Sequence, residues 1–256
     1  MKTTLSGKDL DLLLGGRHWD PFSVLGPHVT GKGDRRLVSI RAIHPRAREV
    51  HVLRDAAGGE QRVEMTRVHP DGVFEALFPG ERQKFPYRLE FVTHDGYRWA
   101  QHDPYAFGLV LSDFDIHLLA EGTHLDEYRK LGSHAGAIGG VPGTTFAVWA
   151  PNAERVSVVC NFNHWDGRVH PMRNRGGSGI WEIFLPGVGE EEVYKYEIRA
   201  RATGELFAKT DPFAFRFEAP PRTGSIVCTL EGYEWGDGTW MEERKAELLP
   251  VPYFHV

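Results

Sequence analysis

The segment Pro45-Arg-Ala-Arg-Glu-Val50 is followed 106 residues later (151 − 45) by the similar segment Pro151-Asn-Ala-Glu-Arg-Val156. Four more pairs of similar segments follow in the same order, and their offsets stay between 106 and 108 residues. These pairs are Gly72-Val-Phe74 with Gly179-Ile-Trp181, Phe78-Pro-Gly80 with Leu185-Pro-Gly187, Tyr87-Arg-Leu-Glu90 with Tyr194-Lys-Tyr-Glu197, and Asp103-Pro-Tyr-Ala-Phe107 with Asp211-Pro-Phe-Ala-Phe215. Chance matches would not keep one order and one spacing, so the sequence indicates two copies of one domain of about 100 residues.

The repeated segments have the pattern of β-strands. Apolar and charged residues alternate in Tyr87-Arg-Leu-Glu-Phe91 and in Tyr194-Lys-Tyr-Glu-Ile-Arg199, as expected for strands with one buried and one wet face. Turn-forming pairs such as Pro79-Gly80 and Pro186-Gly187 separate the runs. Short strands with such turns favour antiparallel sandwiches over alternating strands and helices. The sequence therefore predicts an all-β chain of two tandem β-sandwiches.

Two short helices are predicted beside the strands. The first, an N-terminal helix over Ser6–Leu14, has a serine cap, an acidic first turn and a stop at Gly15-Gly16. The second, over Thr123–Leu131, repeats this pattern and ends at a glycine. Because it lies between the two copies, we expect it to be the connector helix. The glycine-rich segment 132–143 is expected to be a loop that opens the second copy.

These elements divide the chain into four parts. A chain of 256 residues suits two ordinary domains, since each can bury a core of its own. The predicted parts are a first β-sandwich module over residues 1–118, a connector over 119–139, a second β-sandwich module over 140–232 and a C-terminal tail over 233–256.

The charge balance argues against several classes of partner. Lys and Arg number 30 and Asp and Glu number 35, without a long run of either sign, so neither a nucleic-acid surface nor a membrane patch is expected. The beginning of the chain lacks a basic stretch that leads into an apolar one, and no window approaches the ~20 apolar residues that cross a bilayer. We expect a cytoplasmic protein with a neutral polar ligand.

Cysteine and histidine show no disulfide or metal pattern. The two cysteines, Cys160 and Cys228, are too few for a disulfide framework and lack CxxC spacing, so both are expected to be buried thiols. None of the 13 histidines shows His-x-x-x-His spacing beside an acidic residue. No metal site and no cofactor is therefore expected.

Several segments carry a resemblance to a known family. Gly16-Arg-His-Trp-Asp-Pro-Phe-Ser-Val-Leu-Gly-Pro-His28 and the segment 119–134 resemble the opening segment and the interdomain connector of bacterial 1,4-α-glucan (glycogen) branching enzymes. Thr145-Phe-Ala-Val-Trp-Ala-Pro-Asn-Ala-Glu-Arg-Val156 and Asn161-Phe-Asn-His-Trp-Asp-Gly167 resemble the glycogen-binding module that precedes catalytic domains of the α-amylase family. The resemblance implies immunoglobulin-like sandwiches and a part in glycogen biosynthesis. Cys160-Asn161 stands where the family usually has Gly-Asp, so the geometry of this turn is not carried over from the family.

The resemblance implies a non-catalytic N-terminal region of a branching enzyme. Branching requires two carboxylates, which in this family lie at the strand ends of a barrel of ~250 residues, and the two sandwiches already occupy the chain. No catalytic residue is predicted, and Asp20, Asp103, Asp166 and Asp211 are expected to have structural roles in turns. The implied role is to bind or position α-glucan, such as glycogen or malto-oligosaccharides, for an α-amylase-type catalytic barrel. The tail 233–256 would lead into that barrel.

The predicted glucan-binding residues are Trp165, Lys195, Asn163 and His164. A sugar stacks its C–H face on an aromatic plane while polar groups bind its hydroxyls. Trp165 follows a turn rich in Asn, Asp and Gly, and Lys195 lies on the wet face of its strand. The resemblance assigns glucan contact to Trp165 and Lys195. The alternative is a tryptophan packed under a loop and a solvated lysine.

Other aromatic positions give weaker signals. A second aromatic residue expected after the lysine strand is not evident, and Leu206 lies near that place. Trp149 and Trp181 are expected in the core. Three interpretations remain open: a binding and positioning region joined to a branching barrel, a stand-alone scaffold or regulatory glucan-binding protein, and part of an active enzyme. The preferred glucan length, sugar binding by the first module and the oligomeric state also remain open.

Overall fold

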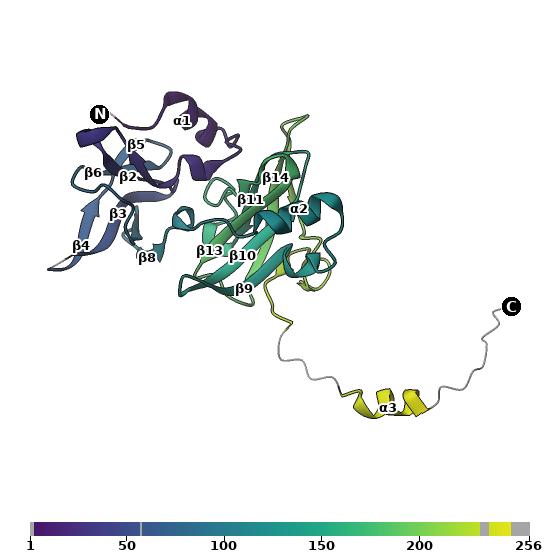
Figure 1. Ribbon diagram of the computed structural model, residues 1–256. Coiled ribbons are helices and arrows are strands. Elements are labelled where there is room, and N and C mark those ends of the chain that lie inside the picture. Colours follow the sequence, from purple (N-terminus) through teal and green to yellow (C-terminus); the bar gives the residue numbers. More distant parts are fainter. Residues whose placement is uncertain (1–2, 57, 231–235, 247–256) are drawn as a thin grey trace.

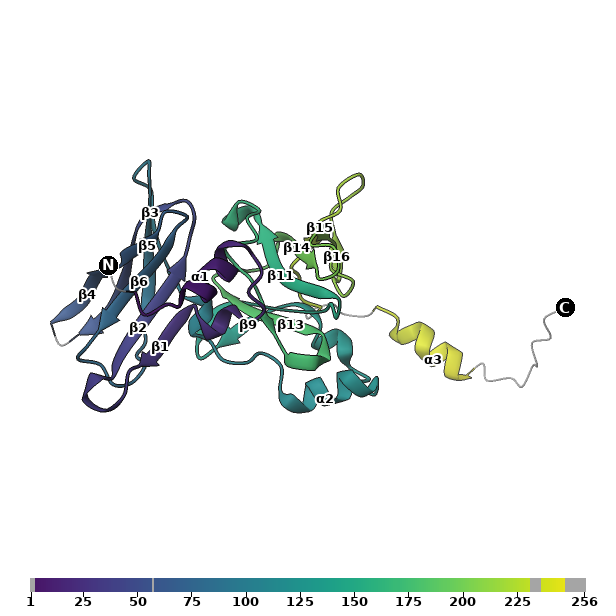
Figure 2. The ribbon, with the colours of Figure 1, turned by 90° about the horizontal axis from the view of Figure 1, so that it is seen from above.

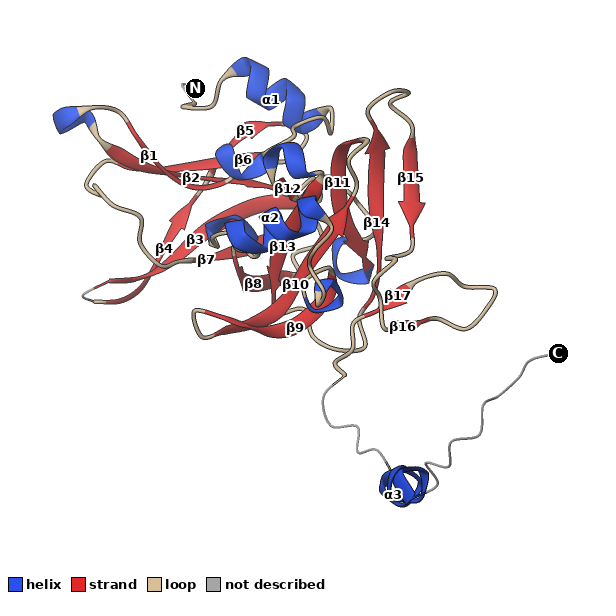
Figure 3. Ribbon diagram, turned by 45° about the vertical axis from the view of Figure 1, so that its right-hand side comes forward, coloured by secondary structure: helices blue, strands red, loops and turns tan. Residues whose placement is uncertain are grey.

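The computed structural model describes residues 3–56, 58–230 and 236–246, and it confirms the all-β prediction. The described residues form two β-sandwiches side by side, each built from two antiparallel sheets (Figure 1). Few helices accompany the strands (Figure 3). The described α-helices are α1 (Gly7–Leu14), α2 (Asp113–Glu121) and α3 (Gly238–Ala246). The predicted tail, 233–256, lies within the described residues only over 236–246.

The first sandwich pairs its strands into two sheets of four. One sheet has the order β1 (Gly26–Thr30), β2 (Leu37–Ile43), β6 (Val73–Phe78) and β5 (Thr66–His69). The other has the order β4 (Gly59–Glu64), β3 (Ala47–Ala56), β7 (Arg88–Thr93) and β8 (Arg98–His102). Inward-facing Ile40, Val52 and Phe74 lie in the core between them.

The second sandwich repeats this plan. One sheet has the order β12 (Arg173–Asn174), β13 (Ile180–Pro186), β10 (Val141–Trp149) and β9 (Gly132–Ile138). The other has the order β11 (Ala153–Cys160), β14 (Val193–Ala200), β17 (Ser225–Ile226) and β16 (Arg216–Phe217), and β15 (Leu206–Lys209) also pairs with β14. Phe146, Trp181 and Tyr196 are fully buried between the sheets. Burial of Trp181 confirms its prediction as a core residue.

The internal repeat extends to irregular features of the backbone. The β3–β7 pairing has a bulge between Ala47 and Glu49, and the β11–β14 pairing has one between Ala153 and Arg155. A β-bulge bends its strand and is usually kept within a family, so its recurrence at matching positions supports a duplicated domain. In the first copy Gly72 has a φ of 86°, and a Cβ there would lie 2.3 Å from the carbonyl oxygen of His44.

A buried tyrosine–aspartate pair closes each sandwich. Tyr87 donates from its hydroxyl to Oδ2 of Asp103 at 2.6 Å, and Tyr194 donates to Oδ2 of Asp211 at 2.6 Å. The other carboxylate oxygen accepts a main-chain N–H two residues ahead, at 2.9 Å in the first copy and 2.8 Å in the second. Both aspartates therefore have the structural role that their Asp-Pro context predicts. Burial raises the pKa of Asp103 to about 6, although the hydrogen bond from Tyr87 lowers it.

The helix predictions were half right. The first is confirmed: Ser6 caps α1 by accepting from the N–H of Asp9. The second is wrong, because α2 begins after Ser112, which forms a capping box with Asp115, and ends at Gly122 in the left-handed conformation. Residues 123–131 hold only a short 3-10 turn, Glu127–Arg129. None of the described helices is long and apolar enough to cross a bilayer.

The segment 132–143 is also not a loop. It forms β9 and the start of β10, whose residues pair in register from Gly132 with Ala147 to Ile138 with Val141. The glycines that suggested a loop instead supply a two-residue turn, since Gly139 and Gly140 both have positive φ. The second sandwich therefore begins at Gly132.

The joint between the sandwiches is buried. The N–H groups of Val110 and Leu111 donate to the carboxylate of Glu182 at 3.0 and 2.9 Å, and Glu182 is itself 1% exposed. Helix α1 lies between the two sandwiches (Figure 2), where Leu13 joins a cluster of apolar side chains that continues into the second core. The hydroxyl of Tyr105 lies 3.2 Å from the carbonyl oxygens of both Val169 and Pro171. These contacts fix the second sandwich against the first.

Candidate functional site

The candidate site lies on a loop that leaves β11. The chain turns outward after Cys160 and returns beside β11 at His170, whose carbonyl oxygen accepts the N–H of Val158 at 3.2 Å. Two residues at the tip, His164 and Trp165, have left-handed φ values of 55° and 58°. Non-glycine residues adopt this conformation only where the surroundings hold them. The N–H of Trp165 is held by the carbonyl oxygen of Cys160 at 2.9 Å.

Asn163 supports this loop from inside. It is 2% exposed, and its Oδ1 accepts the N–H of Cys160 at 3.0 Å. Its Nδ2 donates to the carbonyl oxygen of Val158 at 2.8 Å and lies 2.9 Å from Nδ1 of His170. Burial lowers the pKa of His170 to about 3, so the ring is neutral and can accept this hydrogen bond. Our assignment of Asn163 to glucan contact is therefore wrong, because its amide is enclosed and fully used.

Trp165 is presented at the surface. Its side chain borders a hollow of about 440 Å³, and the residue is 41% exposed. Its Nε1 donates to Oδ1 of Asn161 at 2.9 Å, which fixes the direction of the indole. Leu206 on β15, 53% exposed, borders the same hollow, and so does Arg46 from the first sandwich. We call this space the Trp165 hollow.

Paired charges form the floor of the Trp165 hollow. Arg155 donates to the carbonyl oxygen of Gly167 at 2.8 Å and forms a short ion pair with Glu197. A Cβ at Gly167 would collide with the Glu197 carboxylate, so a larger residue there would displace this ion pair. Burial would raise the pKa of Asp166, but its hydrogen bonds from Arg168 outweigh burial and lower it. The floor is therefore polar yet internally neutralised, which suits an uncharged ligand.

Lys195 lies outside the Trp165 hollow. It pairs across the sheet with Val159, one residue before Cys160, where β11 ends and the loop that carries Trp165 begins. Its Nζ donates to Oγ1 of Thr223 at 2.7 Å, and Lys195 is not among the residues that line the Trp165 hollow. Of the four predicted residues, the structure brings only Trp165 and His164 together in that hollow.

Two other sequence predictions are corrected. Trp149 is 61% exposed, not in the core, because alternation along β10 turns Val148 inward and the tryptophan outward. Cys160 is buried as predicted, whereas Cys228 is only half-buried. Sequence reasoning also missed Arg46, since nothing local indicates that this turn of the first sandwich reaches the loop of the second.

Comparisons with known proteins identify both sandwiches. Residues 6–105 match the family model of the N-terminal domain of the alpha-1,4-glucan branching enzyme GlgB. Residues 130–214 match carbohydrate-binding module 48, the isoamylase N-terminal domain. The first match favours branching over debranching enzymes, as the opening segment of the chain predicted.

Relatives cover nearly the whole chain. It is 50% identical, over 94% of its length, to the 1,4-alpha-glucan branching enzyme GlgB of Paramagnetospirillum magneticum, and 48% identical, over 95%, to that of Rhodospirillum rubrum. The chain spans only 31% and 33% of these relatives. A pullulanase from Anoxybacillus sp. LM18-11 complexed with maltotriose aligns with 75% of this chain at 18% identity and a TM-score of 0.32, which is too low to support an argument.

The matches are restricted to the non-catalytic domains of these enzymes. Together they account for both sandwiches, and the catalytic domain is not covered. The chain therefore corresponds to the non-catalytic N-terminal region of 1,4-α-glucan branching enzymes, in which a branching-enzyme N-terminal domain is followed by a carbohydrate-binding module 48.

Proposed function

We propose that the second sandwich binds α-glucan in the Trp165 hollow and so holds glycogen or malto-oligosaccharides for an α-amylase-type catalytic domain. The observation that carries this proposal is the exposed indole of Trp165, fixed by its hydrogen bond to Asn161. A rigid aromatic plane can stack on the C–H face of a glucose ring with little loss of side-chain entropy.

The surrounding residues supply limited polar contact. His164 borders the hollow and can bind a hydroxyl, whereas Arg155 and Glu197 are already paired with each other. Lys195 would have to share its hydrogen bond with Thr223 or give it up. One stacked ring and few free donors predict weak binding, with dissociation constants from high micromolar to millimolar, or roughly 4–6 kcal/mol.

Calorimetric titration with maltoheptaose tests this proposal. Trp165→Ala should weaken the measured binding, since it removes the stacking surface of the Trp165 hollow. Trp149→Ala is the matched control, because Trp149 is an even more exposed tryptophan of the same sandwich that does not line the hollow. Equal binding by wild type and Trp165→Ala, with folding verified by circular dichroism, would refute the site.

The proposed role is positioning, so the chain should not branch glucan by itself. Incubation of residues 1–256 with amylose should yield no α-1,6 linkages above a heat-killed control. Measurable branch formation, detected as debranching-sensitive side chains, would contradict a purely non-catalytic role.

A further inference from the structure

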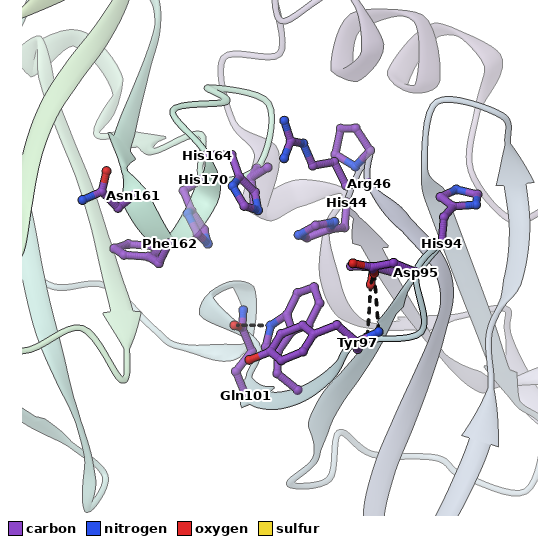
Figure 4. A pocket seen from close by; sticks show the side chains of 14 residues that line it. His44, Arg46, His94, Asp95, Tyr97, Gln101, Asn161, Phe162, His164 and His170 are labelled. Carbon is purple, nitrogen blue, oxygen red and sulfur yellow. Dashed lines mark hydrogen bonds between the residues drawn. The ribbon is translucent and has the colours of Figure 1, made fainter.

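A second, larger cleft lies between the two sandwiches (Figure 4). It has a volume of about 890 Å³, within the range of about 300–1,000 Å³ that small-molecule sites occupy. The β7–β8 hairpin and the turn before β3 form its walls in the first sandwich, and the loop after β11 forms the opposing wall in the second. We call it the interdomain cleft.

The hairpin wall is a stack of aromatic rings that rises from the core to the surface. Trp99 stacks on buried Phe91, with centroids 5.1 Å apart and planes at 20°. Tyr97 stacks on Trp99 at 5.8 Å and 24°, and Tyr97 is 65% exposed. Trp99 is further fixed by its Nε1, which donates to Oε1 of Gln101 at 3.2 Å. Because the rings beneath it hold this large exposed ring in place, it offers a rigid surface on which a ligand can stack.

An aromatic ring also lines the opposing wall. Phe162 is 40% exposed and packs against His170, with centroids 5.4 Å apart. In Figure 4, Phe162 and Tyr97 border the same opening from the two sandwiches. The cleft therefore offers two apolar surfaces that the C–H faces of a non-aromatic ring could contact.

Polar groups around these rings carry no dominant charge. Asp95 and Arg46, of opposite sign, line the cleft together with the exposed His94. Burial, together with the charge of neighbouring His164, lowers the pKa of His44 to about 4, so this ring is neutral near pH 7. Nδ1 of His44 is buried and has no hydrogen-bond partner among the described residues. A neutral imidazole nitrogen can donate or accept, and a buried one without a partner is expected to have a use.

The two walls are held at a fixed separation. Tyr105 reaches from the first sandwich to the carbonyl oxygens of Val169 and Pro171, directly beside His170. The apolar cluster under α1 is continuous across the joint. A cleft between fixed walls requires little reorganisation to bind a ligand, which favours recognition by weak stacking and hydrogen bonds.

We propose that the interdomain cleft is a second α-glucan site, formed by both sandwiches, which holds one malto-oligosaccharide segment between Tyr97 and Phe162. Aromatic faces for C–H contact, mixed donors and acceptors for hydroxyls, and the lack of a net charged surface match an uncharged sugar better than a phosphate or nucleic acid. The proposal rests on the proposed function, since it assumes that the chain recognises α-glucan, but it depends on different aromatic residues.

Site-resolved NMR titration with maltoheptaose separates the two sites. Amide signals of Gly96 and Gln101 report on the cleft, and those of Gly167 and Leu206 report on the Trp165 hollow. Tyr97→Ala and Phe162→Ala should each weaken the cleft titration roughly three- to tenfold, the factor expected for one aromatic contact, and leave the hollow titration unchanged. Trp165→Ala should do the reverse. Tyr128→Ala, an exposed tyrosine outside the cleft, is the matched control.

The outcomes distinguish failure of one site from failure of the other. If Gly96 and Gln101 do not titrate while Gly167 and Leu206 do, or if both cleft variants fold and titrate like wild type, the cleft proposal is wrong and the proposed function stands. If only the cleft titrates, the cleft proposal stands and the Trp165 assignment is wrong. Comparable cleft binding of cellohexaose, a β-1,4 glucan, would overturn the assignment to α-glucan.

Discussion

The two sandwiches share a buried framework, and one surface connection differs between them. Both have a bulge at the start of a strand, and both close with a buried tyrosine–aspartate pair. In the first, β3 pairs directly with the next strand, β4, from His51 with Glu64 to Ala56 with Gly59. In the second, the corresponding strand β11 gives way to the loop that carries Trp165.

After this connection, the two copies again have the same backbone pairing. The N–H of Met65 donates to the carbonyl oxygen of Val50 at 2.8 Å, and the N–H of Met172 donates to that of Val156 at 2.8 Å. The buried methionine thus follows the β3–β4 pair in the first copy and the outward loop in the second. A duplicated core can keep its packing while one connection acquires a site, because loops tolerate change that the core does not.

The largest expected effect is the loss of stability when a side chain that supports the Trp165 loop is removed, compared with a side chain of the β3–β4 pair. Asn163→Ala should destabilise the protein by roughly 3 kcal/mol or more, since each buried polar group left without a partner costs about 1–3 kcal/mol. The hairpin has no such dependence: Gln61→Ala, which removes an exposed acceptor for Arg54, should change stability by less than about 0.5 kcal/mol. Urea unfolding measures both. Similar midpoints for the two variants would show that the loop does not depend on its buried amide.

A second prediction concerns the shared tyrosine–aspartate pairs. Tyr87→Phe should destabilise by about 1.5–3 kcal/mol, because it removes the side-chain donor to a buried carboxylate. Tyr194→Phe should cost about 1 kcal/mol, since Asp211 keeps a hydrogen bond from Tyr196 at 3.1 Å. Each variant differs from wild type by the loss of one hydroxyl oxygen, so the two losses can be compared directly. An equal or larger loss for Tyr194→Phe in urea unfolding would contradict this asymmetry.

The joint between the copies should respond to acid through His44. Its folded pKa of about 4 lies below the ordinary histidine value of 6.5, so the unfolded chain binds a proton first and stability falls as the pH drops from 6.5 toward 4. At pH 5 this group should cost about 1–2 kcal/mol relative to pH 7.5. His44→Gln should lose less stability between these two pH values than wild type. The opposite contribution of Asp103 is present in both proteins and cancels in the comparison.

The smallest predicted effect compares Lys195 with its counterpart Arg88. Arg88 forms an ion pair at 2.6 Å with Glu60 of the hairpin, whereas Lys195 donates to the hydroxyl of Thr223. Lys195→Ala should weaken maltoheptaose binding by no more than about threefold, the loss of a single solvent-exposed hydrogen bond. Arg88→Ala should leave binding unchanged. A loss above tenfold for Lys195→Ala in calorimetry would place Lys195 at the centre of the site.

Sequence reasoning succeeded where the signal was local and periodic. Alternation in Tyr194–Arg199 and the Asp-Pro turns predicted strands and closures that the structure contains, because side-chain period and turn chemistry act over a few residues. It failed at α2, where the capping box from Ser112 to Asp115 was overlooked and a similar pattern at 123–131 was preferred. It also failed for 132–143, where glycines that make a hairpin turn were interpreted as a loop.

The candidate site was predicted only in part. Trp165 was found through the resemblance of its loop to a known module, but the role of Asn163 depends on burial, which a turn-like sequence does not reveal. The interdomain cleft was not predicted at all. Its two walls come from segments at least 60 residues apart (161 − 101), and their meeting depends on packing at the joint, to which no local pattern points.

The shared border of the two hollows has a further consequence. Arg46 and His164 line both the Trp165 hollow and the interdomain cleft, so the two spaces adjoin. A glucan long enough to cross this border would make its second contact at a high effective concentration, because the first contact already tethers it. Affinity should then rise steeply with the degree of polymerisation once one chain can occupy both spaces. Short oligosaccharides would exchange freely, while the outer branches of a large polymer would be retained by avidity.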